Sequence, residues 1–314
     1  MSKTFVMTAL LVGLSVVAGA ASPGPGISLT ANDRFDLDHP IEDPLLLLVT
    51  LYNGQASSVS IENLQHAEIL AAAKSSSGYS EMSPEERQAL DDEYAPIEIP
   101  TFSLGSPTRA LRDLVRITVT DDAGETVDVA VPPLASTPAS SGAVSFDGSG
   151  VEMLFFGIDT DALAGLGAGT YTVRAVLDTS SEPGMWRGEI VSPPVTVRLG
   201  ARSAGEPTTD RLYAVGLYRW LDHEYEASLD LAQRILAPDS ASIAGLVLAG
   251  DSLDGLGRPE EALQSFSAAF DAYSVHLEAA GGELEPPRYI ATRIVQLQEQ
   301  LGRRIQSSLP DRQQ

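Results

Sequence analysis

The sequence predicts a chain of two parts, the first built from β-strands and the second from helices. Three observations lead to this fold class. Short apolar or alternating runs, separated by Gly, Pro and Asp turns, recur from residue 27 to residue 199. The linker-like segment 201–209, within the run GARSAGEPTT, follows these strands. Beyond it the apolar period changes from two residues to 3.6, as in amphipathic helices.

Composition narrows the classes of function. The chain has 314 residues, which fits about two domains at roughly 150 residues each. Its net charge of −23 argues against nucleic-acid binding, which depends on clustered cationic side chains. The absence of cysteine excludes disulfides, thiolate nucleophiles and cysteine-based metal sites. Only two of the twenty basic residues are lysines, which is typical of a bacterial protein from a GC-rich genome.

Residues 1–20 are predicted to be a secretory signal peptide. Lys3 precedes an apolar run from Phe5 to Val17, and the small residues Ala18-Gly19-Ala20 provide a cleavage site. The alternative is an uncleaved N-terminal anchor, although the run is shorter than the ~20 residues that span a membrane. We therefore expect an exported protein, periplasmic or extracellular, whose mature chain has no membrane span.

Residues 21–200 are predicted to form an antiparallel β-sandwich. Leu45–Tyr52 is continuously apolar, as in a strand covered on both faces, whereas Gly169–Asp178 alternates between apolar and polar positions. About seven short strands with tight turns are typical of this architecture. The other expected strands are Asp113–Thr120, Thr126–Val131, Val151–Ile158, Trp186–Val191 and Val195–Leu199.

Two segments interrupt the strand pattern. Residues 63–95 are polar and Ala-rich, and we predict a helical insertion there. Ser83, Pro84 and Glu86 have the order of a capping box with proline at the first helical position, which predicts a short helix from Pro84 to about Asp92. Residues 132–150 are rich in Ser, Pro and Gly and are expected to form a loop.

The helical part contains a repeat with a constant spacing. Gly216 pairs with Gly250 at this spacing, and several apolar positions pair in the same way. The other pairs are Leu212 with Leu246, Val215 with Ala249, Ser228 with Ala262, Ala232 with Phe266, and Ile235 with Ala269. The spacing equals the period of the tetratricopeptide repeat, which is about 34 residues.

The second of these units resembles a tetratricopeptide (TPR) repeat most closely. Its small, large and aromatic residues stand at the positions that the family uses, namely Gly250, Leu253, Gly257, Ala262, Phe266 and Ala269. The first unit departs from the family where Asp222-His223 replaces the Leu-Gly turn. Residues 210–304 are thus expected to be a TPR-like helical module, with a last helix from about Pro287 to Leu301 and a flexible tail at 305–314.

The resemblance implies a concave face lined by the first helix of each unit. On this face a TPR-like module binds an extended peptide or a partner's surface. The matching positions, and our candidate partner-binding residues, are Tyr213, Leu217, Trp220, Leu248 and Asp251. Trp220 is the strongest candidate because partly exposed aromatic anchors contribute much of the binding energy at interfaces; packing in the core is the alternative for this side chain.

The strand-rich part resembles bacterial extracellular immunoglobulin-like domains. The phrase GAGTYTVRAVLD and the later SPPVTV are similar to the last strands of such modules. The expected fold class is therefore multi-domain β + α, an immunoglobulin-like antiparallel β-sandwich with a helical insertion, followed by a short TPR-like α-helical repeat module. This resemblance implies a fold and no catalytic residue.

Gly250-Asp251-Ser252-Leu253 spells the nucleophile motif of the GDSL esterases. That chemistry needs the serine on a tight turn after a strand, with an Asp and a His supplied together downstream. Here the four residues lie in a predicted helix, and the only later histidine, His276, has no Asp three residues before it. We therefore reject the hydrolase interpretation of this motif.

Metal and charge patterns are weak. The four histidines include no His-x-x-x-His pair, so a zinc site is not expected. The acidic stretch Asp33–Asp43 offers oxygen ligands for calcium but lacks the spacing of a calcium-binding loop, and a solvated stretch is favoured. Residues 288–314 carry five arginines and two acids. These cations either dock on the acidic body, dock on a partner, or follow the cation preference of a helix C-terminus.

The sequence therefore predicts an exported protein-binding scaffold or adaptor that is not an enzyme and uses no cofactor. Two units are fewer than a free-standing repeat stack usually needs. The second hypothesis is a structural or assembly module, in which the helices pack on the sandwich or pair in a homodimer. A third is a sandwich that binds carbohydrate or an envelope polymer, which would need exposed aromatics such as Tyr171 and Trp186. Enzymes that cleave glycosides use paired carboxylates, and no such pair stands out.

Overall fold

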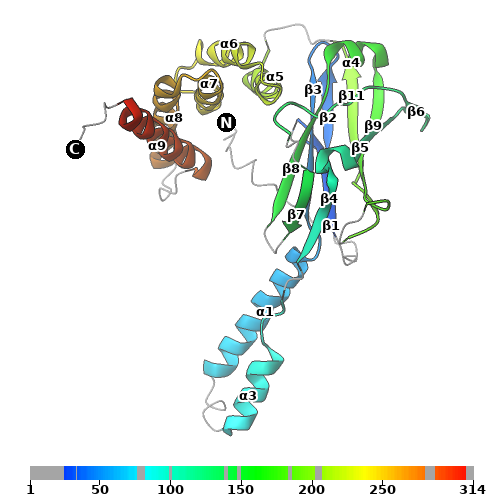
Figure 1. Cartoon of the computed structure of the whole chain (residues 1–314), viewed down its shortest axis with the longest axis vertical. Coiled ribbons are helices and arrows are strands. Elements are labelled where there is room, and N and C mark those ends of the chain that lie inside the picture. The colour runs from blue at the N-terminus through cyan, green and yellow to red at the C-terminus, as the bar shows by residue number, and fades with distance from the viewer. Residues whose placement is uncertain are drawn as a thin grey trace.

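The computed structural model describes residues 25–308 except residues 33, 76–81, 99–100, 138–140, 147–149, 183–185, 202–206 and 280–286. The predicted signal peptide and the end of the predicted tail lie outside this range. The fold is mixed, with several antiparallel sheets in the first two thirds of the chain and helices in the last third. Figure 1 shows these two parts side by side.

The first sheet has the order β1–β3–β8 and is antiparallel throughout. Its strands are Pro25–Ala31, Leu45–Asn53 and Val151–Ile158. The predicted strand Leu45–Tyr52 is β3, the centre of this sheet, and most of its side chains are buried. Burial on both faces explains why its sequence is continuously apolar. The prediction of this strand is confirmed.

The second sheet has the order β2–β11–β9–β5–β6, and β10 pairs with β9. The β2–β11 pair is parallel and the other pairs are antiparallel. On β9 the residues Tyr171, Val173, Ala175 and Leu177 are buried, as the alternation predicts. The bounds are Asp36–Pro40 for β2, Val115–Thr120 for β5, Thr126–Val127 for β6, Gly169–Asp178 for β9, Glu189–Val191 for β10 and Val195–Gly200 for β11.

One apolar core joins the two sheets. Leu47 and Phe156 of the first sheet and Val173 of the second belong to a single cluster of buried side chains. A smaller sheet pairs β4 (Phe102–Ala110) with β7 (Ser141–Phe146), and the Phe102 and Phe146 rings stack at 5.3 Å between centroids. The expected loop at 132–150 is thus wrong in its middle, where β7 packs Phe146 into the core. The short 3-10 helix η2 (Leu111–Leu114) leads from β4 into β5.

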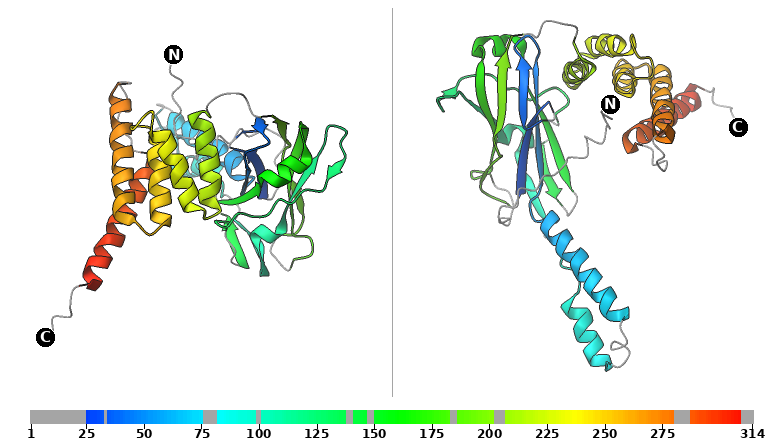
Figure 2. Two further views of the ribbon diagram at one scale, coloured as in Figure 1. Left: turned by 90° about the horizontal axis from the view of Figure 1, so that it is seen from above. Right: turned by 180° about the vertical axis from the view of Figure 1, so that it is seen from behind.

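A helical hairpin projects from one end of the sheets, between β3 and β4 (Figures 1 and 2). It consists of α1 (Ala56–Ser75) and α3 (Pro84–Glu93). The capping box at the start of α3 is confirmed, because Ser83 and Glu86 each accept a hydrogen bond from the other's backbone N–H. The insertion begins at residue 56 and not at about 63. No Gly or Pro interrupts 56–75, so one helix runs through this whole segment.

A further short helix, α4 (Thr160–Leu166), connects β8 to β9. Asp159 caps it by accepting a hydrogen bond from the Ala162 N–H at 2.7 Å. Gly167 ends it with a φ of +79°, a left-handed conformation that favours glycine. The Tyr171 hydroxyl donates to the Leu166 carbonyl at 2.6 Å and fixes this corner.

The helical part runs from α5 to α9. The bounds are Thr209–Leu221 for α5, Tyr225–Leu236 for α6, Ile243–Gly255 for α7, Pro259–Ala279 for α8 and Arg288–Ser308 for α9. The starts of α5 and α7 are offset by the spacing of the sequence repeat, and so are the starts of α6 and α8. The turn residues His223 and Gly257 share this offset, and both have positive φ, of 64° and 72°. His223 thus adopts the conformation that glycine supplies in the second unit.

Helix α5 docks directly on the sheets. Its Tyr218 is 5% exposed, and its ring lies against Gly157 of β8, where an added Cβ would meet a ring atom at 2.6 Å. Leu46 and Leu134 from the strand part and Leu221 of α5 complete this cluster. The Ser136 N–H donates to the Leu221 carbonyl at 2.8 Å. At the other end of α5, Arg211 pairs with Asp43.

We expect Tyr218→Ala to separate the two parts of the chain. Truncation of a buried aromatic side chain costs about 3–5 kcal/mol, and here the loss falls on the seam between helices and sheets. Hydrogen exchange at the Ser136 amide should accelerate, and denaturant unfolding should change from one transition to two. Tyr218→Phe keeps the ring and serves as the control. Unchanged Ser136 protection in the alanine variant would contradict the role of this contact.

Candidate functional site: a cleft among helices

The helical part contains a cleft of about 330 Å³. Its lining comes from one end of α5, the start of α6, the second half of α7 and the first half of α9. The lining residues are Trp220, Tyr225, Asp251, Asp254, Gly255, Tyr289 and Arg293. This set combines aromatic side chains with two carboxylates and one guanidinium.

The aromatic walls are held in place from behind. The Tyr225 ring lies flat against Gly255, where a Cβ would come within 2.5 Å of a ring carbon. His223 stacks on Tyr225, at 5.4 Å between centroids. Trp220 is half-buried, and it packs against the cluster that joins α5 to the sheets. The docking of the two parts therefore also positions one wall of the cleft.

A hydrogen-bonded ion cluster forms the floor. The Tyr289 hydroxyl donates to Asp251 Oδ1 at 2.6 Å, and Arg293 Nη2 donates to Asp254 Oδ2 at 2.7 Å. Arg293 Nε lies 3.5 Å from Asp251 Oδ1, which is an ion-pair distance and too long for a strong hydrogen bond. The Arg293 guanidinium also lies over the Phe266 ring, 5.5 Å from its centroid.

Burial controls the protonation of this floor. Asp251 is 7% exposed, and burial raises its pKa to about 6, against the opposing effects of Tyr289 and Arg293. The pKa of Tyr289 is also raised, by burial of its hydroxyl and by the neighbouring Asp251 charge. The Tyr289 residue as a whole is 39% exposed. Its hydroxyl therefore points into the floor while part of the ring faces solvent.

The structure brings together two of the five candidate residues. Trp220 and Asp251 both line the cleft. Leu217 instead packs at the seam with the sheets, and Tyr213 is half-buried against the apolar cluster of α5, α6 and α7. Leu248 is 2% exposed and packs closely against Gly216, so its assignment to a binding face is corrected. In this sequence a large apolar residue at that position fills the contact between two helices.

Sequence reasoning missed Tyr225, Asp254, Tyr289 and Arg293. Tyr225 and Asp254 lie at helix ends, outside the paired positions of the repeat. Tyr289 and Arg293 lie on α9, beyond the two matched units. Arg293 belongs to the basic segment for which docking on the acidic body was one of three hypotheses, and this residue does pair with Asp251 and Asp254.

The GDSL-like motif has a packing role. Ser252 is fully buried in α7, and its Oγ lies 2.7 Å from the Leu248 carbonyl and 2.8 Å from Ser228 Oγ. The serine is thus closed off from solvent in the middle of a helix. Its rejection as an esterase nucleophile agrees with this environment.

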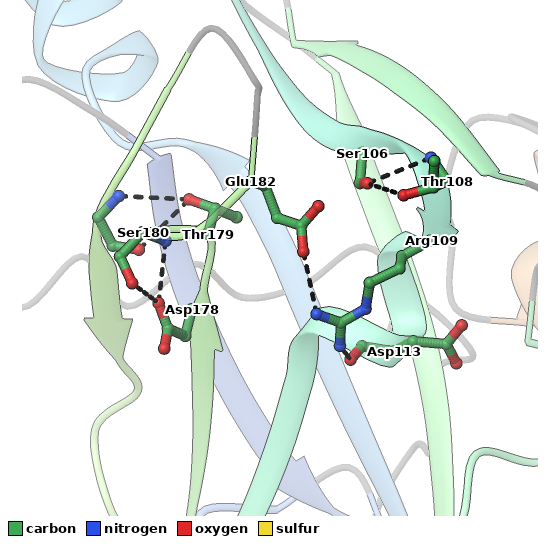
Figure 3. Close-up of polar contacts among 9 residues, drawn as sticks. Ser106, Thr108, Arg109, Asp113, Asp178, Thr179, Ser180 and Glu182 are labelled. Atoms are coloured by element: carbon green, nitrogen blue, oxygen red, sulfur yellow. Dashed lines mark hydrogen bonds and ion pairs between the residues drawn. The ribbon is translucent and has the colours of Figure 1, made fainter.

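A second polar cluster connects the loop between β9 and β10 to β4 (Figure 3). Glu182 is buried and pairs with Arg109 at 3.0 Å, and Arg109 also donates to the Asp113 carbonyl. The hydroxyl of Ser106 and the Arg109 guanidinium lower the pKa of Glu182. The charged groups of Glu182 and Arg109 are thus paired with each other within the cluster. We call this cluster of Ser106, Arg109 and Glu182 the clasp and interpret it as a structural connection between β4 and the loop.

No group of three or more His, Asp or Glu side chains is placed to hold a metal ion within the parts of the chain that the structure describes. In the acidic stretch, Asp36 and Asp38 pair with Arg198, and Asp43 pairs with Arg211. Asp33 lies outside the described residues. Among the helices described, none combines the length and apolar character needed to cross a membrane.

Comparison with known proteins assigns no family to the chain. No family model and no curated protein matches it. Among solved structures, it is similar to a family 123 glycoside hydrolase from Clostridium perfringens, with a TM-score of 0.26 and 8% sequence identity. The match covers 60% of this chain and 29% of the hydrolase chain.

This match corrects one expectation. The sequence predicted that the chain is not an enzyme, and the solved structure it resembles is that of a hydrolase. We therefore withdraw the exclusion of enzymatic activity. At this TM-score the likeness assigns no reaction and no catalytic residue to the chain.

The ionisation of Asp251 should make the free energy of unfolding depend on pH. Because its folded-state pKa of about 6 lies above the ordinary 3.8, the unfolded chain releases this proton more easily than the folded one. The group therefore lowers the free energy of unfolding above pH 6, by about 3 kcal/mol, and this loss disappears as the pH falls toward 4. Asp251→Asn should remove this pH dependence.

Urea unfolding of the wild type and of Asp251→Asn, from pH 4 to pH 8, measures the effect as a difference between two curves. The control is Asp230→Asn, which removes an exposed charge from α6. If the difference in unfolding free energy between the wild type and Asp251→Asn stays constant from pH 4 to pH 8, Asp251 has an ordinary pKa and the prediction is wrong.

The clasp predicts the opposite pH dependence. Because the pKa of Glu182 is lowered in the folded state, its contribution to stability is present above the unfolded value and is lost as the pH falls through the folded one. Glu182→Gln should therefore lower the free energy of unfolding at pH 7, and its difference from the wild type should shrink below about pH 4. Thermal unfolding at pH 7 and pH 3 measures this, with the exposed Glu125→Gln as control. Equal effects of the two variants at pH 7 would argue against the clasp.

Proposed function

We propose that this chain is an exported protein-binding scaffold in which an immunoglobulin-like sandwich carries a short TPR-like module. The TPR-like assignment is supported by the constant offset between corresponding helices and by the matching left-handed turns at His223 and Gly257. The sandwich assignment is supported by two sheets that share one apolar core. Export is supported by the signal-like residues 1–20.

The observation that carries the binding function is the cleft. Its walls come from α5, α7 and α9, the first helices of successive units and the helix after them, with Tyr225 at the start of α6. In a TPR-like stack these helices line the concave face. Trp220 and Tyr289 present partly exposed aromatic surface there, which is the kind of anchor that contributes most to interface affinity.

The contact between α5 and the sheets bears on the assembly hypothesis. The cluster of Leu46, Leu134, Tyr218 and Leu221 supports packing of the helices on the strand part within one chain. Such packing is compatible with binding, because it gives the cleft a fixed orientation. A glycan-binding face is less well supported, since Tyr171 is buried and Trp186 is half-buried against the core.

The test is selection of extended peptides from a display library, followed by titration of the selected peptides. The chain has two tryptophans, so Trp186→Phe leaves Trp220 as the sole reporter in the cleft. A peptide bound there should shift Trp220 fluorescence. Trp220→Ala should raise the dissociation constant at least tenfold, because an aromatic anchor is worth about 2 kcal/mol or more.

Trp186→Ala is the matched control, because it makes the same truncation in the strand part. Trp220→Phe retains ring packing, and a thermal melt of each variant shows whether it is folded. Selected peptides that bind the wild type and Trp220→Ala equally would overturn the proposed site.

A further inference from the structure

We propose that the cleft binds a cationic side chain, lysine or arginine, from a segment of the partner protein. This inference rests on the proposed binding function and specifies the chemistry of the occupant. It follows from the charge of the floor, the aromatic walls and the volume of the cleft. Each of these is independent of the repeat pattern.

The charge of the lining favours a cation. Asp251 and Asp254 face one guanidinium, that of Arg293, so the fully ionised floor carries a net charge of −1. Arg293 is already engaged by Asp254 and by Gln296, whose Oε1 accepts a hydrogen bond from Arg293 at 3.0 Å. An anionic ligand would therefore have to compete with two carboxylates for the Arg293 guanidinium.

The surroundings of the cleft have the same sign. The described segments 207–279 and 287–308, which contain α5 to α9, hold thirteen acidic and eight basic residues. A surface of this charge attracts basic segments and repels acidic ones, and the effect weakens as salt increases. A partner with a basic segment is thus favoured both on approach and at the floor.

The walls suit a cation as well. Trp220, Tyr225 and Tyr289 contribute aromatic rings to the lining, and Trp220 and Tyr289 are partly exposed. Aromatic rings attract ammonium and guanidinium groups. The chain uses the same chemistry for its own cation, because Arg293 sits over Phe266 beside two carboxylates. A ligand cation at the mouth would meet carboxylates and aromatic rings in a similar combination.

The volume limits the occupant to a small group. A space of about 330 Å³ lies at the lower end of the range for ligand pockets, which is roughly 300–1,000 Å³. It has room for one or two side chains. The remainder of a peptide would lie along the helices outside the cleft, and this favours a protein segment over a large free ligand.

The experiment compares three synthetic versions of each peptide whose binding depends on Trp220. The versions carry Lys or Arg, Gln, or Glu at the anchor position. We expect the cationic version to bind at least fivefold more tightly than the Gln version, and the Glu version to bind most weakly. Raising the salt concentration should narrow these ratios.

A charge variant tests the floor directly. Asp254→Asn preserves an acceptor for Arg293 and removes one charge, so it should weaken the cationic peptide at least fivefold and leave the Gln peptide within twofold. Asp230→Asn removes an exposed charge on α6 and should change both by less than twofold. The free amides of N-acetyl-lysine and N-acetyl-arginine, used as competitors, should bind far more weakly than the peptides.

The outcomes separate this inference from the proposed function. If Gln or Glu peptides bind as tightly as cationic ones and still depend on Trp220, the cationic anchor is overturned and the binding cleft stands. If the N-acetyl-lysine and N-acetyl-arginine amides bind as tightly as the peptides, the occupant is a small cationic ligand and not a segment of a protein. If no peptide depends on Trp220, both proposals fall.

Discussion

The close approach of α5 to β8 is the contact on which the arrangement of the two parts depends. The Tyr218 ring can approach the first sheet this closely only because residue 157 has no side chain, and Leu46, Leu134 and Leu221 belong to the same buried cluster. Exclusion of water from this seam is the main driving force. Because Trp220 packs on the same cluster, the seam also fixes one wall of the cleft. The proposed binding surface is therefore positioned by the strand part of the chain.

Within the helical part, residues without bulky side chains let neighbouring helices approach closely. Gly250 of α7 meets the Phe266 ring of α8, and Gly255 meets the Tyr225 ring of α6. Glycine inside a helix costs roughly 0.5–1 kcal/mol relative to alanine, so its presence needs a packing reason, and these contacts supply it. The second contact bears directly on the cleft, since it holds Tyr225 flat as a wall.

The sequence was most informative where local pattern and burial agree. The continuous apolar run of β3, the alternation of β9 and the capping box at Ser83 each follow from rules that act over a few residues, and each is confirmed. Strand β7 was missed because it lies within a segment rich in Ser, Pro and Gly, and its pairing with the distant β4 defines it. Likewise, Tyr289 and Arg293 meet Asp251 from a distant part of the chain, and no local pattern reports such a contact.

The floor of the cleft shows what such a long-range contact does. A buried ion cluster contributes little net stability, because removing charges from water offsets much of their mutual attraction. Its effect is on geometry. Tyr289 and Arg293 are one helical turn apart on α9, so they share a face of the helix beside the buried Ile290 and Leu297. Apolar contacts alone tolerate small rotations and shifts of a helix. The Tyr289 hydroxyl and the Arg293 guanidinium, in contrast, reach Asp251 and Asp254 together in only one register of α9. The same cluster therefore fixes the last helix and leaves the floor of the cleft with an excess of negative charge.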